Sequence, residues 1–296
     1  MTRILLLGKN GQLGWELHRT LATLGELTAI DYPEIDLEQP ETGRDLIHRI
    51  RPNVIVNAAA YTAVDQAETE QEKVRKINAI VPGVLAEEAR KRKAVFIHYS
   101  TDYVFDGKKG TPYVEEDAPN PLNYYGRSKL EGEHLVQEAG GDFLILRTSW
   151  VYSLRQQGGF VNKVLQWSRQ QETLRIVDDQ IANPTWARML AEMTAQILAR
   201  GFGYIQERAG LYHLAGGGFA SRYEWARSIL ELDPHRRDQT AREIIAADTK
   251  EFPTPALRPL FSALDCAKFS KTFGVQIPDW RESLSLAMQR KNDHAA

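Results

Sequence analysis

The sequence lacks three features that would each place it in a distinct class of protein. It has a single cysteine, Cys266, which excludes an internal disulfide bond and a zinc site built from cysteines. No apolar run reaches the roughly 18 residues of a membrane-spanning helix, and residues 4–7 are too few for the core of a signal peptide. The formal net charge of −2 provides no long-range attraction to nucleic acid or to an anionic membrane. These absences predict a soluble, cytoplasmic protein that binds neither nucleic acid nor a membrane.

What the sequence does contain is an alternation of short apolar runs with amphipathic segments. At 296 residues, of which 43% are hydrophobic, the chain is long enough to bury a large core. Runs that are apolar on both faces and alternate with helices are typical of a parallel sheet covered on both sides. The apolar runs are residues 4–7, 27–30, 54–56, 95–97 and 143–146. The pattern predicts an α/β fold with a Rossmann-type, doubly wound parallel sheet.

A glycine-rich loop, GKNGQLG from Gly8 to Gly14, follows the first apolar run and opens a helical pattern. Glycines allow the backbone to approach a ligand closely, and the free N–H groups of a helix N-terminus suit a pyrophosphate. Asp31 ends the second run at about the spacing, roughly 20 residues, of a carboxylate that binds the adenosine ribose. A purely structural turn is the alternative. The position between strand and helix favours a dinucleotide site.

The type of dinucleotide stays open between NADH and NADPH. Asp31 favours NADH, because its charge would repel the 2′-phosphate of NADPH. Lys9 and Arg3 are nearby cations that could offset this repulsion. After the third run, Ala58, Ala59 and Ala60 leave room for a ring or ribose at the strand end, although close helix packing is the alternative.

The second half of the sequence is less regular and predicts a smaller lobe. We expect residues 1–150 to form the dinucleotide-binding Rossmann domain and residues 151–296 mainly a substrate-binding lobe, interleaved with it. Residues 174–199 are expected to return to the Rossmann domain, whereas residues 211–214 are assigned to the lobe. No flexible linker separates the halves, so the lobe is expected to pack over the carboxyl edge of the sheet.

A tyrosine and a lysine four residues apart form the candidate catalytic pair. Tyr125 and Lys129 share one face of an expected helix. The ammonium is expected to lower the pKa of the phenol, which could then protonate a carbonyl oxygen while hydride reaches the carbon. Thr101 or Ser100, at the end of the fourth run, would bind the same oxygen. Exposed helix pairs with this spacing are common, but the glycine loop upstream favours a catalytic role.

Longer strings resemble the dTDP-4-dehydrorhamnose reductase family, within the extended short-chain dehydrogenase/reductase superfamily. They run from residue 4 to about residue 280 and so cover nearly the whole chain. The clearest are GKNGQLG at 8–14, NAAAYT at 57–62, YSTDYVF at 99–105, YGRSK at 125–129 and RTSWVY at 147–152. The resemblance implies reduction of the C4 ketone of dTDP-6-deoxy-L-lyxo-4-hexulose to dTDP-L-rhamnose, with hydride from NADPH or NADH.

The resemblance also implies a role for each matching residue. Tyr125 would be the proton donor, Lys129 its activator and a ribose ligand, and Thr101 the catalytic hydroxyl. Arg258 would meet the diphosphate of the substrate. The residues expected to bind cofactor are Gly8, Asn10, Gly11, Gln12, Leu13, Gly14, Asp31, Ala58, Ala59, Ala60, Tyr61, Ser100, Tyr125 and Lys129. Those expected to bind substrate are Thr101, Phe105, Trp150, Gln180, Asn183 and Arg258.

The sequence departs from the family at a possible metal site, and it leaves two alternative functions open. Some relatives hold Mg²⁺ with acidic residues at a dimer interface, and Glu16 matches one such position, but Arg188 stands where another acid is needed. We therefore expect no metal, and either a monomer or a homodimer. One alternative function is another sugar-nucleotide 4-ketoreductase, of the 6-deoxy-talose type. The other is a non-catalytic, NADP-binding regulatory subunit, because the β subunit of methionine adenosyltransferase resembles the same family.

Overall fold

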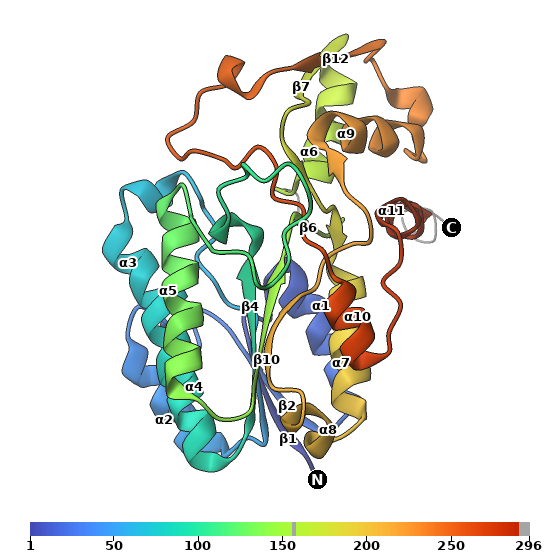
Figure 1. Cartoon of the computed structure of the whole chain (residues 1–296). Helices are drawn as coiled ribbons and strands as arrows, with labels where there is room; N and C mark the ends of the chain where they lie inside the picture. Colours follow the sequence, from blue (N-terminus) through green and yellow to red (C-terminus); the bar gives the residue numbers. More distant parts are fainter. Residues whose placement is uncertain (156–157, 290–296) are drawn as a thin grey trace.

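The computed structural model describes residues 1–155 and 158–289. Its centre is a six-stranded sheet with the order β10-β5-β4-β3-β1-β2, in which every neighbouring pair is parallel (Figure 1). The strands are β1 (Arg3–Leu7), β2 (Glu26–Ile30), β3 (Val54–Asn57), β4 (Val95–Thr101), β5 (Phe143–Thr148) and β10 (Gly210–His213). The first five are the predicted apolar runs. The predicted fold class, a doubly wound parallel sheet, is confirmed.

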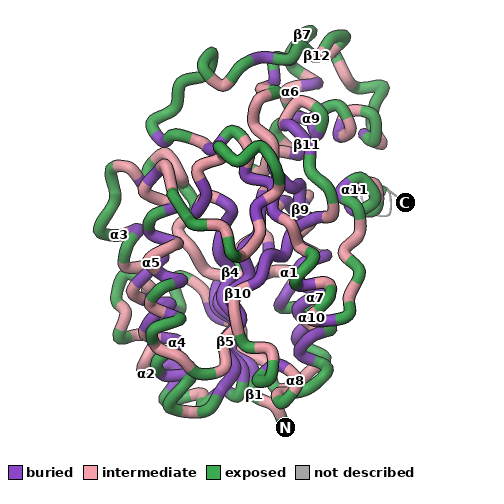
Figure 2. The backbone as a smooth tube through the Cα atoms, viewed as in Figure 1, coloured by how far each residue is buried: buried purple, intermediate pink, exposed green. Residues whose placement is uncertain are grey.

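Helices cover both faces of this sheet, because the side chains of each strand alternate between two cores. In β1, Ile4 and Leu6 pack toward one side, whereas Leu5 and Leu7 pack toward the other. The first side is covered by α1 (Gln12–Leu21) and α7 (Ala187–Ala199), and the second by α2 (Pro40–Ile50), α4 (Val81–Arg92) and α5 (Tyr124–Ala139). Figure 2 shows the buried strands running through the middle of the molecule.

A smaller lobe lies over one edge of the sheet (Figure 1). Its core is aromatic and includes Trp225 and Trp280, which are buried. The lobe is built from α6 (Phe160–Gln170), β7 (Thr173–Val177), α9 (Arg222–Glu231), β12 (Glu243–Ala247) and α11 (Trp280–Gln289). Short strands form two further pairs, β6 (Val151–Tyr152) with β9 (Thr185–Trp186) and β8 (Ile181–Ala182) with β11 (Ala220–Ser221).

Two assignments of segments differ from the sequence-based expectation. Residues 174–199 divide: α7 packs on α1 beside the central sheet, but β7 pairs with β12 in a separate two-stranded sheet. The reason is that Thr173 and Arg175 of β7 are exposed, and such a half-polar strand does not suit a sheet covered on both faces. Conversely, β10, which was assigned to the lobe, pairs with β5 at the edge of the central sheet.

The remaining elements are short helices that connect these parts. They are η1 (Gln66–Glu68), α3 (Gln71–Arg75), η2 (Lys76–Ile80), η3 (Asp102–Val104), α8 (Phe202–Gln206), η4 (Arg236–Asp238), η5 (Thr249–Glu251) and α10 (Ala267–Phe273). Within residues 1–155 and 158–289, none of the helices combines the length and the apolar character that crossing a membrane requires.

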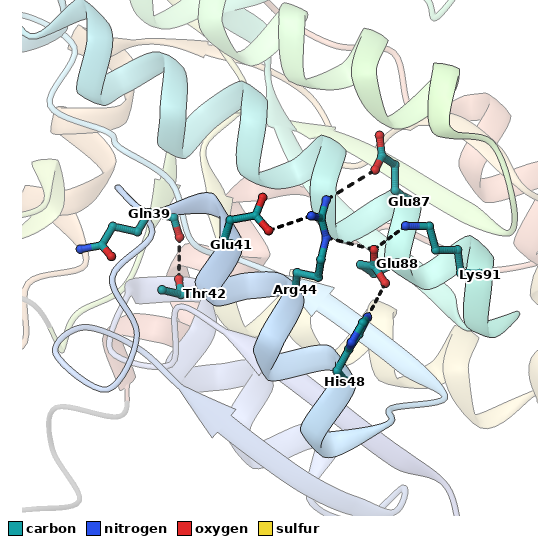
Figure 3. A network of polar contacts seen from close by, with 8 residues as sticks. All are labelled: Gln39, Glu41, Thr42, Arg44, His48, Glu87, Glu88 and Lys91. Carbon is teal, nitrogen blue, oxygen red and sulfur yellow. Dashed lines mark hydrogen bonds and ion pairs between the residues drawn. The ribbon is translucent and has the colours of Figure 1, made fainter.

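A group of charged side chains, the Glu88 network, joins α2 to α4 (Figure 3). Glu88 is only 2% exposed, yet it contacts Arg44 at 3.2 Å, His48 at 2.9 Å and Lys91 at 2.6 Å. Arg44 also pairs with Glu41 at 2.7 Å. Burial by itself would raise the pKa of Glu88, but the hydrogen bonds from Lys91 and His48 hold it below its ordinary value. The network therefore keeps a buried carboxylate charged.

Candidate active site

The glycine loop packs against the end of β3, at the carboxyl edge of the central sheet. Gly8 has a φ of +86°, and a Cβ on it would lie 2.6 Å from the backbone nitrogen of Ala59. A Cβ on Gly14 would lie 1.8 Å from the carbonyl oxygen of Gly8. Neither position can carry a side chain without moving backbone. The loop and the alanines thus form a surface of bare backbone next to the N-terminus of α1.

A cavity of about 530 Å³ opens beside this loop, and we call it the outer cavity. Asp31 lines it, and its carboxylate accepts hydrogen bonds from the backbone N–H groups of Asn10 and Tyr32, both at 2.8 Å. The other lining residues include Gly8, Gly11, Ala58, Ala59, Ala60, Asp36, Glu38 and Lys73. The carboxylate is therefore fixed in place, in the position predicted for a ribose ligand.

Two lysines near the outer cavity already have partners. Lys73 pairs with Glu38 at 2.8 Å, and Lys9 forms an ion pair with Glu34. Because both lysines are neutralised by these glutamates, the offset to Asp31 that the sequence suggested for Lys9 is weakened.

A second cavity, of about 330 Å³, shares Gly11, Ala58 and Ala60 with the outer one, and we call it the crevice. The crevice brings together segments that lie far apart in the sequence. Its other lining residues are Gln12, Leu13, Thr62, Tyr99, Ser100, Thr101, Asp102, Tyr125, Lys129, Thr148, Ser149, Trp150 and Val151. The predicted trio of Thr101, Tyr125 and Lys129 is thus assembled next to the glycine loop.

Tyr125 stands in the first turn of α5, which the side chain of Asn123 caps by accepting a hydrogen bond from the N–H of Gly126 at 2.8 Å. Burial raises the pKa of the Tyr125 phenol, and a hydrogen bond with Thr101 opposes this only in part. The prediction that Lys129 lowers this pKa is wrong for this structure. The phenol is a neutral donor that keeps its proton at neutral pH.

Lys129 is directed toward β4, which explains its small effect on the phenol. Its ammonium donates to the carbonyl oxygen of Tyr99 at 2.7 Å and lies 3.2 Å from Nε2 of His98. The residue is only 1% exposed, and burial lowers its pKa to about 8, while the negative charge of Glu133 acts in the opposite direction. Lys129 is therefore a buried cation whose charge is held only weakly.

The two candidate hydroxyls at the end of β4 differ in their partners. Ser100 donates to Glu133 at 2.5 Å, and Glu133 is held in turn by two hydrogen bonds from Arg147, at 2.9 and 2.6 Å. Thr101 instead donates to the carboxylate of Asp102 and accepts from the backbone N–H of Tyr103, both at 3.2 Å, and its side chain also lowers the pKa of the Tyr125 phenol. Of the two hydroxyls, Thr101 is placed to act together with Tyr125, whereas Ser100 belongs to the buried ion pair behind it.

Trp150 forms the wall of the crevice on the lobe side. It has a φ of +39°, which is unusual for a residue with a bulky side chain and marks a strained backbone. Its ring stacks on Trp225, with centroids 5.6 Å apart, and the guanidinium of Arg222 lies 3.5 Å from the centre of its ring. The indole is thereby fixed at the junction of the sheet and the lobe.

Three residues predicted to bind substrate have side chains engaged elsewhere. Phe105 is buried and stacks on Tyr113 with centroids 4.1 Å apart, in a closed cluster behind the crevice. Asn183 is 2% exposed. Its amide nitrogen donates to the carbonyl oxygens of Gly216 and Gly218, and its amide oxygen accepts from the N–H of Leu264. Gln180 donates to Thr249 at 3.0 Å. Their short-range motifs could not reveal these long-range partners.

Arg258 and Tyr61 also depart from the expected contacts. Arg258 forms two hydrogen bonds with Asp65, at 2.9 and 2.7 Å, so its charge is already neutralised. The phenol of Tyr61 donates to Gln66, and Tyr61 lines neither the outer cavity nor the crevice. Its backbone N–H does bond the side chain of Asn78, which also donates to Ser128 in α5.

The sequence interpretation did not select Asp102 and Arg222. Asp102 lines the crevice next to Thr101, and burial raises its pKa to about 6, against a hydrogen bond from Ser262 at 2.5 Å. Its place in the STDYVF string was a signal that could have found it. Arg222 has no comparable motif, because its position depends on packing against a residue far away in the sequence.

The residues weighed for a metal lie together on α1 and α7. Arg188 pairs with Glu192 at 2.5 Å, and burial raises the pKa of Glu16, against the charges of Arg19 and Arg188. In the part of the chain that the structure describes, no group of three or more potential ligands of the His, Cys, Asp and Glu types could hold a metal ion.

Comparisons with known proteins extend over the whole fold. The family described as "RmlD substrate binding domain" matches residues 1–292. A dTDP-4-dehydrorhamnose reductase of Burkholderia thailandensis is 40% identical over 296 residues, which cover 97% of this chain and 98% of the relative. A crystal structure of a dTDP-4-dehydrorhamnose reductase from Clostridium acetobutylicum superposes with a TM-score of 0.90 at 32% identity, covering 98% of this chain and 100% of that one. The enzyme of that name from Bacillus anthracis, in complex with NADP, gives a TM-score of 0.88 at 31% identity, with 98% and 100% covered.

Proposed function

The chain belongs to the family of the RmlD substrate binding domain, and we propose from this membership that it is a nicotinamide-dependent sugar-nucleotide reductase. It reduces the C4 ketone of dTDP-6-deoxy-L-lyxo-4-hexulose to dTDP-L-rhamnose, with NADPH or NADH as cofactor. The similarity to reductases of this name over nearly the full length of both chains supports the substrate. The observation that carries the proposal is the crevice, in which a neutral tyrosine, a hydroxyl and a buried ammonium lie beside a glycine loop.

The residues around the outer cavity fit a dinucleotide. Gly8 leaves a cradle that any side chain would fill, and the N-terminus of α1 offers free N–H groups to a pyrophosphate. We assign the loop from Gly8 to Gly14 to the pyrophosphate, Asp31 to the adenosine ribose and residues 58–60 to the path toward the crevice. When bound, the reduced nicotinamide supplies the hydride.

The chain's own residues supply the proton. As the carbonyl oxygen gains negative charge, its affinity for a proton exceeds that of a phenolate, so the neutral phenol of Tyr125 can protonate it even with a raised pKa. We assign the hydroxyl of Thr101, whose side chain affects the pKa of this phenol, to hold the same oxygen. We assign the wall beside the sugar to Trp150, whose strained backbone fixes its ring there.

Lys129 contributes charge to the floor of the crevice. Its ammonium is fixed by Tyr99 and lies in a site of low dielectric, where a positive charge stabilises developing negative charge strongly. We also assign it to the nicotinamide ribose, as the resemblance implied. Because its pKa is about 8, it carries this charge at neutral pH and loses it in mild alkali.

The domain division, location and assembly of the protein belong to the same proposal. Residues 1–150 with α7 carry the cofactor, and most of residues 151–296 close over the substrate. A cytoplasmic location suits the reaction, because charged nucleotide substrates do not cross a bilayer unaided. For the assembly we propose either a monomer or a homodimer.

The experiment combines an absorbance assay with identification of the product. Purified protein is mixed with NADH or NADPH and the 4-keto-6-deoxy sugar nucleotide, absorbance is followed at ~340 nm, and the sugar is identified by NMR. We expect cofactor oxidation and a rhamnose-configured product. A talose-configured product would support a sugar-nucleotide reductase but would replace the assignment of dTDP-L-rhamnose as the product. Cofactor binding without any oxidation would instead support the regulatory alternative and defeat the proposal.

A further inference from the structure

Arg222 is the first residue of α9, a helix of the smaller lobe (Figure 1). Its guanidinium stands 3.5 Å from the centre of the Trp150 ring and 4.7 Å from that of Phe160. Trp150 itself lines the crevice. The lobe therefore holds a cation on the ring of Trp150, which lines the crevice together with the candidate catalytic residues.

The charge of Arg222 has no counter-ion among the residues that the structure describes. In residues 1–155 and 158–289, no carboxylate forms an ion pair with it and no atom accepts a hydrogen bond from its guanidinium. The charged and titratable groups that act on it are Tyr103, Asp102 and Arg258. Burial lowers its pKa to about 10, and Tyr103 and Asp102 offset this only in part.

Arg147 and Arg258, whose side chains are 4% and 19% exposed, differ from Arg222 in this respect. Arg147 is bound by Glu133 through two hydrogen bonds, and Arg258 is bound by Asp65 in the same way. Leaving a buried cation without an anion is unfavourable, and aromatic faces compensate only in part. A ligand that brings negative charge would supply what the chain withholds from Arg222.

Arg222 is also held in position before any ligand arrives. Its backbone N–H donates to the carbonyl oxygen of Gln180 at 3.1 Å, and the preceding Ser221 caps α9 through a reciprocal pair of hydrogen bonds with Glu224. Trp150, on which the guanidinium lies, is fixed by its own backbone conformation. Little ordering is then needed to bind an anion, which favours affinity.

We propose that Arg222 binds the diphosphate of the sugar-nucleotide substrate and is its main electrostatic anchor. The planar fork of a guanidinium matches the oxygens of a phosphate, and a desolvated site strengthens the pairing. The inference rests on the proposed function for the identity of the anion. The resemblance implied this role for Arg258, whose guanidinium is bound by Asp65, and the proposal assigns it to Arg222 of α9.

The test compares Arg222→Met with Arg227→Met. Methionine keeps the apolar packing on Trp150 but removes the charge, and Arg227 is an exposed residue of the same helix that contacts Glu231 at 3.8 Å. Binding of dTDP and of thymidine is measured by calorimetry in the full-length protein, together with KM and kcat. For Arg222→Met we expect a loss of dTDP affinity of about 10- to 100-fold, an equal rise in KM, and thymidine and cofactor affinities within about twofold. Arg227→Met should change none of these.

Arg222→Lys is the second variant, because it keeps a charge without the fork. It should recover part of the lost dTDP affinity, and its thymidine affinity should stay within about twofold of the wild type. Unchanged dTDP affinity in Arg222→Met, or equal losses for dTDP and thymidine, would overturn the inference, since the second result marks a purely structural clamp. If wild-type protein binds dTDP through Arg222 but oxidises no cofactor, the proposed reaction fails and this inference stands. If the wild type turns over the substrate and Arg222→Met does so with an unchanged KM, only the inference fails.

Discussion

The Glu88 network and the crevice both bury charged groups, but they treat them in opposite ways. In the network, Glu88 is surrounded by three basic side chains, and their hydrogen bonds lower its pKa despite burial (Figure 3). In the crevice, burial dominates: the pKa of Lys129 falls to about 8 and that of Asp102 rises to about 6. The network thus favours the charged form of its central residue, and the crevice favours the neutral forms.

This difference separates charges that stabilise the fold from charges that are available to a ligand. A paired carboxylate between α2 and α4 links the two helices, and its charge is balanced without any ligand. Groups whose pKa is shifted by burial, and which line a cavity, are the usual sign of a functional site. Changes in the crevice should therefore affect activity more than stability, and changes in the network should do the reverse.

The largest expected effect is on turnover in Tyr125→Phe. Without the phenolic proton, kcat should fall by about 10³-fold, while the affinity for NADH and the melting temperature stay close to those of the wild type. Steady-state kinetics and calorimetry check both halves. Tyr124→Phe is the matched control, because it changes the neighbouring phenol in the same turn of α5. Equal losses in the two variants would remove Tyr125 from the role of proton donor.

Lys129→Met should separate activity from stability most clearly. We expect kcat to fall on the order of 10²-fold, because the ammonium at the floor of the crevice is lost. The free energy of unfolding at pH 7 should not fall, since a buried cation without a full counter-ion is removed. Denaturant titration measures this. A marked loss of stability with little loss of kcat would place Lys129 with the network and not with the crevice.

The pH dependence of the wild type follows from the same residue. Lys129 has a pKa of about 8 in the folded chain and an ordinary value of 10.5, so between these pH values the unfolded chain binds more protons. Its contribution to stability therefore increases as pH rises from about 8 to 10.5, while kcat decreases over the first part of that range as the ammonium is lost. Parallel profiles of kcat and unfolding check the opposite signs, and Lys129→Met should abolish both trends.

Glu88→Gln tests the network. Losing the carboxylate charge that Arg44 and Lys91 contact should lower the free energy of unfolding by about 1–2 kcal/mol, with kcat and KM unchanged. The control is Glu87→Gln, a neighbour on α4 whose carboxylate is half exposed and lies 3.9 Å from Arg44; it should cost less than about 0.5 kcal/mol. A drop in kcat with Glu88→Gln would mean that the two regions are coupled.

The smallest expected effect concerns the choice of cofactor. Asp31 is fixed by two backbone N–H groups, and Lys73 is neutralised by Glu38, so the outer cavity disfavours a 2′-phosphate. Wild type should use NADH with a higher kcat/KM than NADPH. Asp31→Asn should shift the NADPH-to-NADH ratio of kcat/KM by about tenfold toward NADPH, since one repelling charge is removed. An unchanged ratio would show that this carboxylate does not meet the ribose.

The parts of the account that were predictable from sequence are those set by local patterns. The five apolar runs became β1 to β5. The inner strands are apolar because helices cover both of their faces, whereas β2, at the edge of the sheet, is only partly buried. The glycine loop could also be predicted, because a side chain at Gly8 or Gly14 would collide with backbone. The i, i+4 spacing brought Tyr125 and Lys129 to one cavity.

The rest depends on contacts between distant segments, which a local pattern does not encode. The engagement of Arg258 by Asp65 joins residues 193 positions apart, and nothing near either one signals the other. Phe105 belongs to a sequence motif whose other residues line the crevice, but its ring packs on Tyr113 and His213. The fall in the pKa of Lys129 follows from its complete burial beneath β4, which spacing on a helix does not reveal.

Transfer of a label from the cofactor to the sugar tests the central claim most directly. NADH or NADPH deuterated at both positions of nicotinamide C4 is incubated with the protein and the 4-keto sugar nucleotide, and the product is analysed by NMR and mass spectrometry. The account predicts one deuterium at C4 of dTDP-L-rhamnose, and almost none formed in the same time by Tyr125→Phe. A product that carries no deuterium at C4, or no product at all with an active cofactor supply, would contradict it.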